Sequence, residues 1–500
     1  MNTHNTNYKW KFSNPLKTNW FLKLPNEIIQ LIFSQFFNRL ELPNNTQFLR
    51  LLLTCQHWNS IATEMYTQFK LDRVKKLPKV GDFQYLKRYK RSLQSIQILG
   101  GQSLHMGYIN IIVDIVQINQ LTHLNLFSNK MNDYCIIRLI QSLQYQSSLR
   151  FLGLSDTGLT SHTGPYFSDL FKCNKSLREV VLSHNNLGEI GAVAMSKGLE
   201  MNDSLQILNL SYNDIGDIGA REIGRSLQLN KSIQELDLRS NCISPNGSSF
   251  LSEFIELNQS IHAIDLWGNS IGKDGASDIG KALASNSSIR SINLTRNSIQ
   301  SAGIKFITAA LVSKNCNLKS IDLSSNSLCS DGAKDLSEAL FRNQSIQSIT
   351  LSSNKIDHVG IKALCKALRH NQSVTYLNLA FNEISTLGSR YLRKLLKRNT
   401  SLRCLDLSSN QLGAESVPVI ESIQLDQSPL ESLILSHNSI NITSIQSIYH
   451  HFNVTSQTTP IANLKQLRLE FLSPTNQDKE KAASLKLLNR IHNNLVIKLF

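Results

Sequence analysis

The sequence contains 500 residues, 41% of them hydrophobic, and carries a formal net charge of +15. It lacks a continuous apolar stretch of the about eighteen residues that a membrane-spanning helix requires, so we expect no membrane partner. The first 100 residues hold 15 lysines and arginines against 5 acidic residues, and the rest is nearly neutral, which argues against a long groove for nucleic-acid phosphates.

Cysteine spacing and the start of the chain both bear on the compartment. The eight cysteines form neither C-x-x-C pairs nor a metal-ligand pattern, which predicts free thiols in a reducing environment. Residues 1–19 are interpreted as a polar leader, because they lack the apolar core of a secretory signal. We therefore expect a cytoplasmic or nuclear location.

Residues 20–66 are predicted to form a small all-α module. Asn26 can cap a helix that runs to about Phe37 and is apolar on almost every side. A second helix around Trp58 can cover one of those sides. A module of about 45 residues is too small to hide the remainder by itself, so another surface must cover it.

Residues 67–92 carry the densest positive charge and are interpreted as a basic linker or N-terminal cap. The segment from Lys70 to Arg91 could attract nucleic acid or an acidic protein. No aromatic stacking platform accompanies it, so a solvated helical linker is the preferred interpretation and a nucleic-acid partner is not expected.

Residues 93–472 are dominated by one residue that recurs every 28 or 29 positions, with Thr157 in one of its places. This asparagine ladder consists of Asn129, Asn185, Asn213, Asn241, Asn269, Asn297, Asn326, Asn354, Asn382, Asn410 and Asn438. Each member follows an apolar-x-x-apolar-x-apolar lead-in that is typical of a short strand. A fixed period of this length indicates a solenoid, here with about 14 strands.

Within the turn after each strand, buried backbone groups would lack partners, and an asparagine offers both an acceptor and donors to satisfy them. The second half of each repeat has helical spacing with small residues first, as in Gly219 and Ala220. A second ladder, mostly followed by x-Ser, resembles glycosylation sites but is interpreted as turns after the helices. Its members are Asn174, Asn202, Asn230, Asn258, Asn286, Asn343, Asn371 and Asn399.

The two positions before each ladder asparagine are expected on or beside the concave sheet. In five successive repeats they hold residues that are common in protein interfaces: His184, Tyr212, Arg239, Trp267 and Arg296. Strands about 4.8 Å apart place this run over about 20 Å, the size of one binding patch. The other interpretation is an unused surface that varies by chance.

Residues 473–500 are expected to form a C-terminal helical cap. The aspartates Asp237, Asp265, Asp322 and Asp406 are interpreted as ordinary sheet-face residues, because no acid–base partner is placed with them. The sequence has no zinc-protease, nucleophile-elbow or dinucleotide-binding motif. We expect no catalytic residue, no metal and no cofactor.

The repeats resemble leucine-rich repeats of the ribonuclease-inhibitor type. This resemblance implies an α/β solenoid, a horseshoe with a parallel concave sheet and convex helices, which would bind a protein target on its concave face. It also extends to Ran GTPase-activating proteins, so a regulator of a small GTPase or a plain scaffold are the alternative functions. A GTP hydrolysis assay would separate these possibilities.

The N-terminal module resembles an F-box, with Leu24-Pro25 at its start, a helix over Glu27–Ser34 and the signature Cys55-Gln56-His57-Trp58. The connection across Asn38–Thr46 is longer than that family usually has. The resemblance implies binding to the adaptor subunit of a cullin–RING ubiquitin ligase. The residues at or near that interface would be Leu24, Pro25, Ile28, Ile32, Phe33, Cys55 and Trp58.

Overall fold

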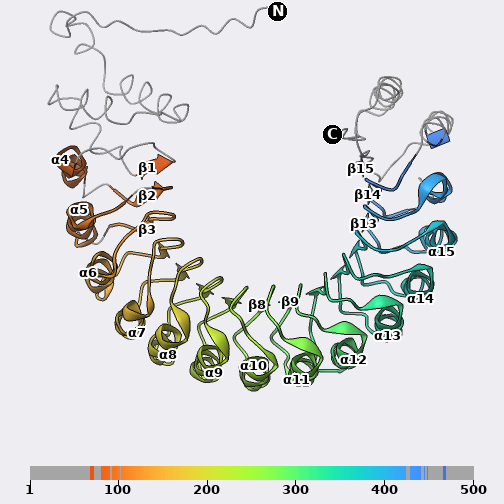
Figure 1. The fold of residues 1–500 in the computed structure, drawn as a ribbon, viewed down its shortest axis with the longest axis horizontal. Coiled ribbons are helices and arrows are strands. Elements are labelled where there is room, and N and C mark those ends of the chain that lie inside the picture. The colour runs from red at the N-terminus through yellow and green to blue at the C-terminus, as the bar shows by residue number, and fades with distance from the viewer. Residues whose placement is uncertain are drawn as a thin grey trace, which may run out of the picture.

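The computed structural model describes residues 68–72, 80–89, 93–101, 103–118, 120–423, 428–440, 444, 447–448 and 466–468. These residues form an open horseshoe with a parallel sheet on the inside and helices on the outside (Figure 1). The sheet has 15 strands, and each strand pairs with the next one along the chain. The predicted solenoid with a concave parallel sheet and convex helices is confirmed.

The strands are short, and most contain three residues. They are β1 (Gln68–Asp72), β2 (Ser95–Leu99), β3 (His123–Asn125), β4 (Phe151–Gly153), β5 (Glu179–Val181), β6 (Ile207–Asn209), β7 (Glu235–Asp237), β8 (Ala263–Asp265), β9 (Ser291–Asn293), β10 (Ser320–Asp322), β11 (Ser348–Thr350), β12 (Tyr376–Asn378), β13 (Cys404–Asp406), β14 (Ser432–Ile434) and β15 (Gln466–Arg468).

A helix follows most strands and packs on the convex side of the sheet (Figure 1). The helices are α4 (Val80–Phe83), α5 (Met106–Val116), α6 (Asp133–Leu143), α7 (Gly164–Cys173), α8 (Gly188–Leu199), α9 (Gly216–Leu227), α10 (Pro245–Leu257), α11 (Gly272–Ser285), α12 (Gln300–Leu311), α13 (Cys329–Arg342), α14 (His358–Leu368), α15 (Thr386–Leu396) and α16 (Ser416–Glu421). In the described residues they are accompanied by the 3₁₀ turns η2 (Gln84–Tyr89), η3 (Ser161–Thr163) and η4 (Gly413–Glu415).

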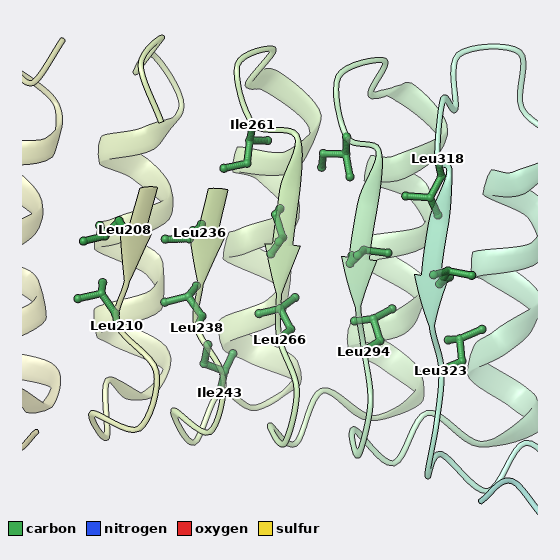
Figure 2. Close-up of a cluster of buried hydrophobic side chains, with 14 of the residues drawn as sticks. Leu208, Leu210, Leu236, Leu238, Ile243, Ile261, Leu266, Leu294, Leu318 and Leu323 are labelled. Carbon is green, nitrogen blue, oxygen red and sulfur yellow. The ribbon is translucent and has the colours of Figure 1, made fainter. Parts of the chain in front are cut away.

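The core lies between the sheet and the helices. In the three-residue strands the middle residue points inward, as Leu236 does in β7, while its two neighbours face the concave side. The third apolar residue of the lead-in, such as Leu238, packs one layer below it (Figure 2). Corresponding residues of successive repeats stack into continuous rows, so every repeat buries its apolar side chains against its neighbours.

Small residues in the helices allow adjacent repeats to approach closely. Gly198 in α8 lies against the main chain of Ser168 in α7, and a Cβ atom there would come within 2.6 Å of the Ser168 Cα. Gly219 in α9 lies against Ile215 and Ala192, where a Cβ would approach to 2.5 and 3.0 Å. The tight curvature of the convex layer therefore depends on these glycines.

The structure differs from the expectation for residues 67–92. We expected a basic linker or an N-terminal cap, and no strand; residues 68–72 form β1, which pairs with β2 in register and extends the sheet by one strand. The helix α4 and the turn η2 then follow, and their Phe83 and Leu86 are buried. This segment is therefore part of the solenoid, and its apolar residues Phe83 and Leu86 belong to the core.

Several expectations fall outside the described residues. They are the polar leader 1–19, the helical module 20–66 with its seven named interface residues, and the C-terminal cap 473–500. The fourteen strands expected in residues 93–472 correspond to β2–β15.

Candidate protein-binding surface

The ladder asparagines lie inside the solenoid and join each repeat to the preceding one. Asn241 is representative: its Nδ2 donates to the carbonyl oxygen of Leu210 at 3.0 Å, and its Oδ1 accepts from the main-chain N–H of Asn213 at 3.0 Å. All eleven ladder asparagines are buried and make the corresponding donation across the repeat boundary. The backbone beneath the concave face is therefore held by a hydrogen bond that recurs in every repeat with a ladder asparagine.

Thr157 fills its place in this ladder only in part. Its hydroxyl donates to the carbonyl oxygen of Leu154 in its own repeat at 2.7 Å, and its N–H donates to the Oδ1 of Asn185 at 3.0 Å. A threonine has no amide group with which to reach the preceding repeat while holding its own turn. The contact that asparagine makes elsewhere is missing from this side chain.

The asparagines of the second ladder also join each repeat to the preceding one, in the turns that follow the helices. In Asn230, Nδ2 donates to the carbonyl oxygens of Leu199 and Asn202 at 2.8 Å, and Oδ1 accepts from the N–H groups of Ser232 and Ile233 at 2.9 Å. All eight asparagines are buried. A glycan would have to replace these bonds, so the side chains act as turn residues in the folded protein.

The turn between each strand and its ladder asparagine determines how the candidate interface residues project. The position immediately before the asparagine has a left-handed backbone, with φ of 56° at His184, 56° at Tyr212 and 54° at Arg296. Arg239 and Trp267 lie one position earlier and are followed by left-handed Ser240 and Gly268. The sequence analysis treated the two positions as equivalent, whereas the structure gives them different directions.

Four of the five candidate residues form one continuous stack, which we call the aromatic rim: His184, Tyr212, Trp267 and Arg296. The His184 and Tyr212 rings are parallel, with centroids 4.0 Å apart. Tyr212 reaches Trp267, two repeats away, with a centroid distance of 6.1 Å. The Arg296 guanidinium lies 5.3 Å from the centroid of the Trp267 ring, in a cation–π arrangement.

Arg239 leaves this stack and turns toward the sheet. Its guanidinium donates to both carboxylate oxygens of Asp237, with an Nη2–Oδ2 distance of 2.7 Å, and lies 3.7 Å from Asp265. The hydrogen bond to Asp237 raises the pKa of Arg239 above its ordinary value. Burial raises the pKa of Asp265, although that carboxylate also accepts from the N–H of Trp267. The gap that Arg239 leaves allows Tyr212 and Trp267 to meet.

The concave face beside the rim is hollowed over β5–β9. This acidic hollow has a volume of about 290 Å³ and is lined by Glu179, Val181, Ile207, Leu208, Asn209, Glu235, Leu236, Asp237, Ala263, Ile264, Asp265, Ser291 and Asn293. Sequence reasoning missed Glu179, Ile207 and Glu235. The signal was present, because all three occupy the same position of successive strands, the one that precedes the buried middle residue.

The aspartates of the sheet face behave alike. Asp237, Asp265, Asp322 and Asp406 each accept a hydrogen bond from the main-chain N–H two residues later, at 2.9–3.1 Å. Asn209 and Asn293 make the same bond in other repeats. The side-chain oxygen therefore closes the turn, and the carboxylate charge is not needed for that task.

Three further observations concern the described part of the chain. It contains no group of three or more histidine, cysteine, aspartate or glutamate residues that could hold a metal ion. Its seven cysteines are free. None of the helices described is both long and apolar enough to cross a membrane.

Comparisons with known proteins give matches to two families. A model described as F-box-like matches residues 21–71. A model described as leucine-rich repeat matches residues 173–196, 202–224, 229–252, 285–307, 314–337, 342–365, 370–392 and 398–417. The two regions follow one another along the chain, as the sequence analysis expected.

Individual proteins are similar to parts of the chain. The chain is 32% identical over 109 residues to "NACHT, LRR and PYD domains-containing protein 3" of Bos taurus, an alignment that covers 21% of this chain and 11% of that protein. The chain therefore spans a small part of that relative. An internalin (inlF) from Listeria monocytogenes is 19% identical, with a TM-score of 0.44 over 72% of this chain and 86% of that one.

Proposed function

We propose that this chain, which is an F-box/leucine-rich-repeat protein, acts as the substrate-recruiting subunit of a cullin–RING ubiquitin ligase. The F-box-like domain and the repeats make it a protein-binding scaffold. The observation that carries the proposal is the joining of an F-box-like domain, residues 21–71, to a horseshoe with an exposed, chemically distinct concave patch. The chain would bring its target to the catalytic subunits without catalysing the formation of a covalent bond itself.

The N-terminal region supplies the adaptor-binding half of this proposal. Ile28 and Ile32 are four residues apart in a predicted helix that is apolar on almost every side, so both can face one partner. Leu24, Pro25, Phe33, Cys55 and Trp58 complete the set of residues expected at or near that interface. Binding of the adaptor subunit would bury the apolar surface that a module of this size cannot bury by itself.

The concave surface supplies the target-binding half. His184, Tyr212, Trp267 and Arg296 form the aromatic rim, and Arg239 is fixed by Asp237 beside it. Large aromatic and guanidinium groups that are already in place lose little conformational freedom on binding, which favours them as anchors of an interface. We therefore assign target binding to this patch.

Adaptor binding tests the proposal directly. The purified adaptor subunit should retain the wild-type chain on a column and should lose the double variant Ile28→Asp, Ile32→Asp. A matched control is Ile190→Asp, Ile218→Asp, since both side chains are exposed on the convex helices α8 and α9. Retention of the first double variant, or loss of both, would count against the adaptor role.

The compartment and the lack of catalysis belong to the same proposal. Free cysteines throughout the described residues support a reducing environment, the cytosol or the nucleus. The repeat of 28 or 29 residues with one strand and one helix supports the ribonuclease-inhibitor type.

The F-box-like match favours an adaptor over a regulator of a small GTPase. The purified chain should therefore not accelerate GTP hydrolysis.

A further inference from the structure

We infer that the acidic hollow and the aromatic rim together bind a segment of the target that is rich in lysine or arginine. This inference rests on the proposed function, because it specifies the chemistry of the target that the concave face would hold. It draws on three features of the surface: an apolar base, carboxylates that lack a cationic partner, and an aromatic stack that already holds a guanidinium.

The base of the hollow suits an amphipathic cation. Ile207 in β6 is paired in register with Glu179 in β5 on one side and Glu235 in β7 on the other. The aliphatic side chain of Ile207 thus lies between two carboxylates. Its strand is about 4.8 Å from the strand on either side. Lysine and arginine combine an apolar stem with a charged end, so the stem can lie on Ile207 while the charge reaches either glutamate.

The two glutamates are available for such a contact. Within the described residues, no ion pair joins either of them to a basic side chain. Arg178 precedes Glu179, but its guanidinium donates to the carbonyl oxygen of Ser204 at 2.7 Å. The other acidic pair differs, because Arg239 binds Asp237 and lies beside Asp265. That internal ion pair shows that the hollow accommodates a guanidinium against its carboxylates.

The rim provides a second place for positive charge. Arg296 lies over Trp267 at 5.3 Å, which shows that this aromatic surface holds a guanidinium in a cation–π arrangement. On the other side of Trp267 the rings of Tyr212 and His184 continue the stack along two more repeats. A peptide that crosses the strands could place successive basic residues on the rim and in the hollow.

Charge complementarity selects this partner over others. Four carboxylates line the hollow, Glu179, Glu235, Asp237 and Asp265, and Arg239 neutralises one of them. A nucleic acid or an acidic peptide would be repelled there. The net positive charge of the chain is concentrated in its first 100 residues, and the remainder is nearly neutral. The acidic hollow is therefore a local concentration of negative charge on the repeats.

A binding measurement with defined peptides tests the inference on the full chain. The probes are fluorescein-labelled peptides of alternating glycine and lysine, glycine and Nε-acetyl-lysine, and glycine and glutamate, followed by fluorescence anisotropy at physiological salt. The variant Glu179→Gln, Glu235→Gln keeps side-chain size and removes both charges. Its matched control, Glu253→Gln, Glu256→Gln, removes the same charge from exposed positions of the convex helix α10.

The lysine peptide should bind the wild type and the α10 control within about twofold of each other, and the hollow variant about tenfold or more weakly. The acetylated and acidic peptides should not bind. Equal losses in both double variants, equal binding of the acetylated peptide, or no binding of the lysine peptide would overturn the inference. Trp267→Leu should weaken binding severalfold without abolishing it, because the carboxylates remain.

The adaptor column separates this inference from the proposed function. The hollow variant should still be retained by the adaptor, because its substitutions lie on β5 and β7. Retention by the adaptor without binding of the lysine peptide contradicts only the inference. Binding of the peptide without retention contradicts only the ligase role.

Discussion

The side-chain Nδ2 of Asn241 donates to the carbonyl oxygen of Leu210 across 3.0 Å, although the two residues are 31 positions apart in the chain. The same amide group accepts the N–H of Asn213 through its Oδ1. One side chain therefore supplies both a donor and an acceptor to the turn of the preceding repeat. The concave surface can present aromatic and charged groups at fixed spacing because this bond recurs in repeat after repeat.

Replacing Asn241 by aspartate should destabilise the repeats. The variant keeps the acceptor but places a carboxylate oxygen against the Leu210 carbonyl in a fully buried site. We expect the free energy of unfolding at pH 7 to fall by about 2–4 kcal/mol, as measured by urea denaturation. Asn315→Asp, at an exposed position, should change it by less than about 0.5 kcal/mol.

The loss in Asn241→Asp should also depend on pH. Burial raises the pKa of a carboxyl, and the protonated group could again donate to Leu210. A folded-state pKa above the unfolded value means that stability is regained as the pH falls, so the difference from the wild type should shrink toward pH 4. An unchanged difference, or a larger one, would show that the donor function is not what Asn241 provides.

Two glycines should respond oppositely to substitution by alanine. Gly198→Ala would bring a Cβ within 2.6 Å of the Ser168 Cα and 2.8 Å of its carbonyl carbon. Because main chain cannot yield as a flexible side chain does, we expect a loss of about 2–3 kcal/mol in urea denaturation. Gly224→Ala meets only ordinary contacts at 3.4–3.6 Å and should be neutral or stabilise the helix by up to about 1 kcal/mol. A similar response from both would contradict the close approach of α7 and α8.

Asp357 caps helix α14 and should give a defined pH dependence. Burial opposes ionisation, but hydrogen bonds from the Ser330 hydroxyl and the N–H groups of Val359 and Gly360 outweigh it and lower the pKa of Asp357 below 3.8. A lowered pKa contributes stability above the ordinary value, and this contribution is lost as the pH falls through the folded-state pKa. The advantage of the wild type over Asp357→Asn should therefore be constant near neutral pH and vanish in acid.

Asp357→Ala provides the comparison that isolates the cap. It removes the acceptor as well as the charge and should cost about 1 kcal/mol at all pH values relative to Asp357→Asn. Thermal unfolding across the pH range measures both differences. A wild-type advantage that grew on acidification would contradict the direction of the pKa shift.

The thiols should be distinguishable by their reactivity. Cys242 and Cys329 are exposed, whereas Cys135, Cys316 and Cys365 are buried and should react only after unfolding. Burial and the negative charge of Asp214 raise the pKa of Cys242, whose sulfur lies 3.7 Å from that carboxylate. Asp214→Asn should lower this pKa, increase the thiolate fraction at pH 7 and accelerate labelling of Cys242.

Cys329 serves as the internal reference in the same sample. It is also exposed, but it belongs to a different repeat from Cys242, the thiol that Asp214 contacts. Its labelling rate, followed by mass spectrometry of the digested protein, should not change in Asp214→Asn. An unchanged rate at Cys242 would mean that the carboxylate does not govern this thiol.

The fold could be predicted from the sequence because its main constraint is local and periodic. A buried asparagine such as Asn241 must recur wherever the same turn recurs, so the ladder reveals the repeat length and the stacking together. The expectation for residues 67–92, a basic linker or N-terminal cap, did not include the strand β1, because no ladder asparagine follows that strand. In the described part of residues 68–89, Phe83 and Leu86 belong to the core, and these side chains carry no periodic signature.

The surface could be predicted only in part. The positions before each asparagine identify His184, Tyr212 and Trp267 as neighbours along the array, but not that Tyr212 reaches Trp267 across an intervening repeat. That contact depends on Arg239 turning toward Asp237. The spacing in the sequence does not indicate whether Arg239 packs on the aromatic rim or binds Asp237. Glu179 and Glu235 were not predicted, because they lie on the strands β5 and β7, whereas the periodic signal lies in the turns.

Co-purification from cells with two complementary variants tests the central claim, that one chain links an adaptor to a separate target. Ile28→Asp, Ile32→Asp should lose the adaptor subunit but keep the other partners. Tyr212→Ala, Trp267→Ala should keep the adaptor and lose partners that the wild type retains. If both variants lose the same proteins, or neither loses the adaptor, the two-ended scaffold is contradicted.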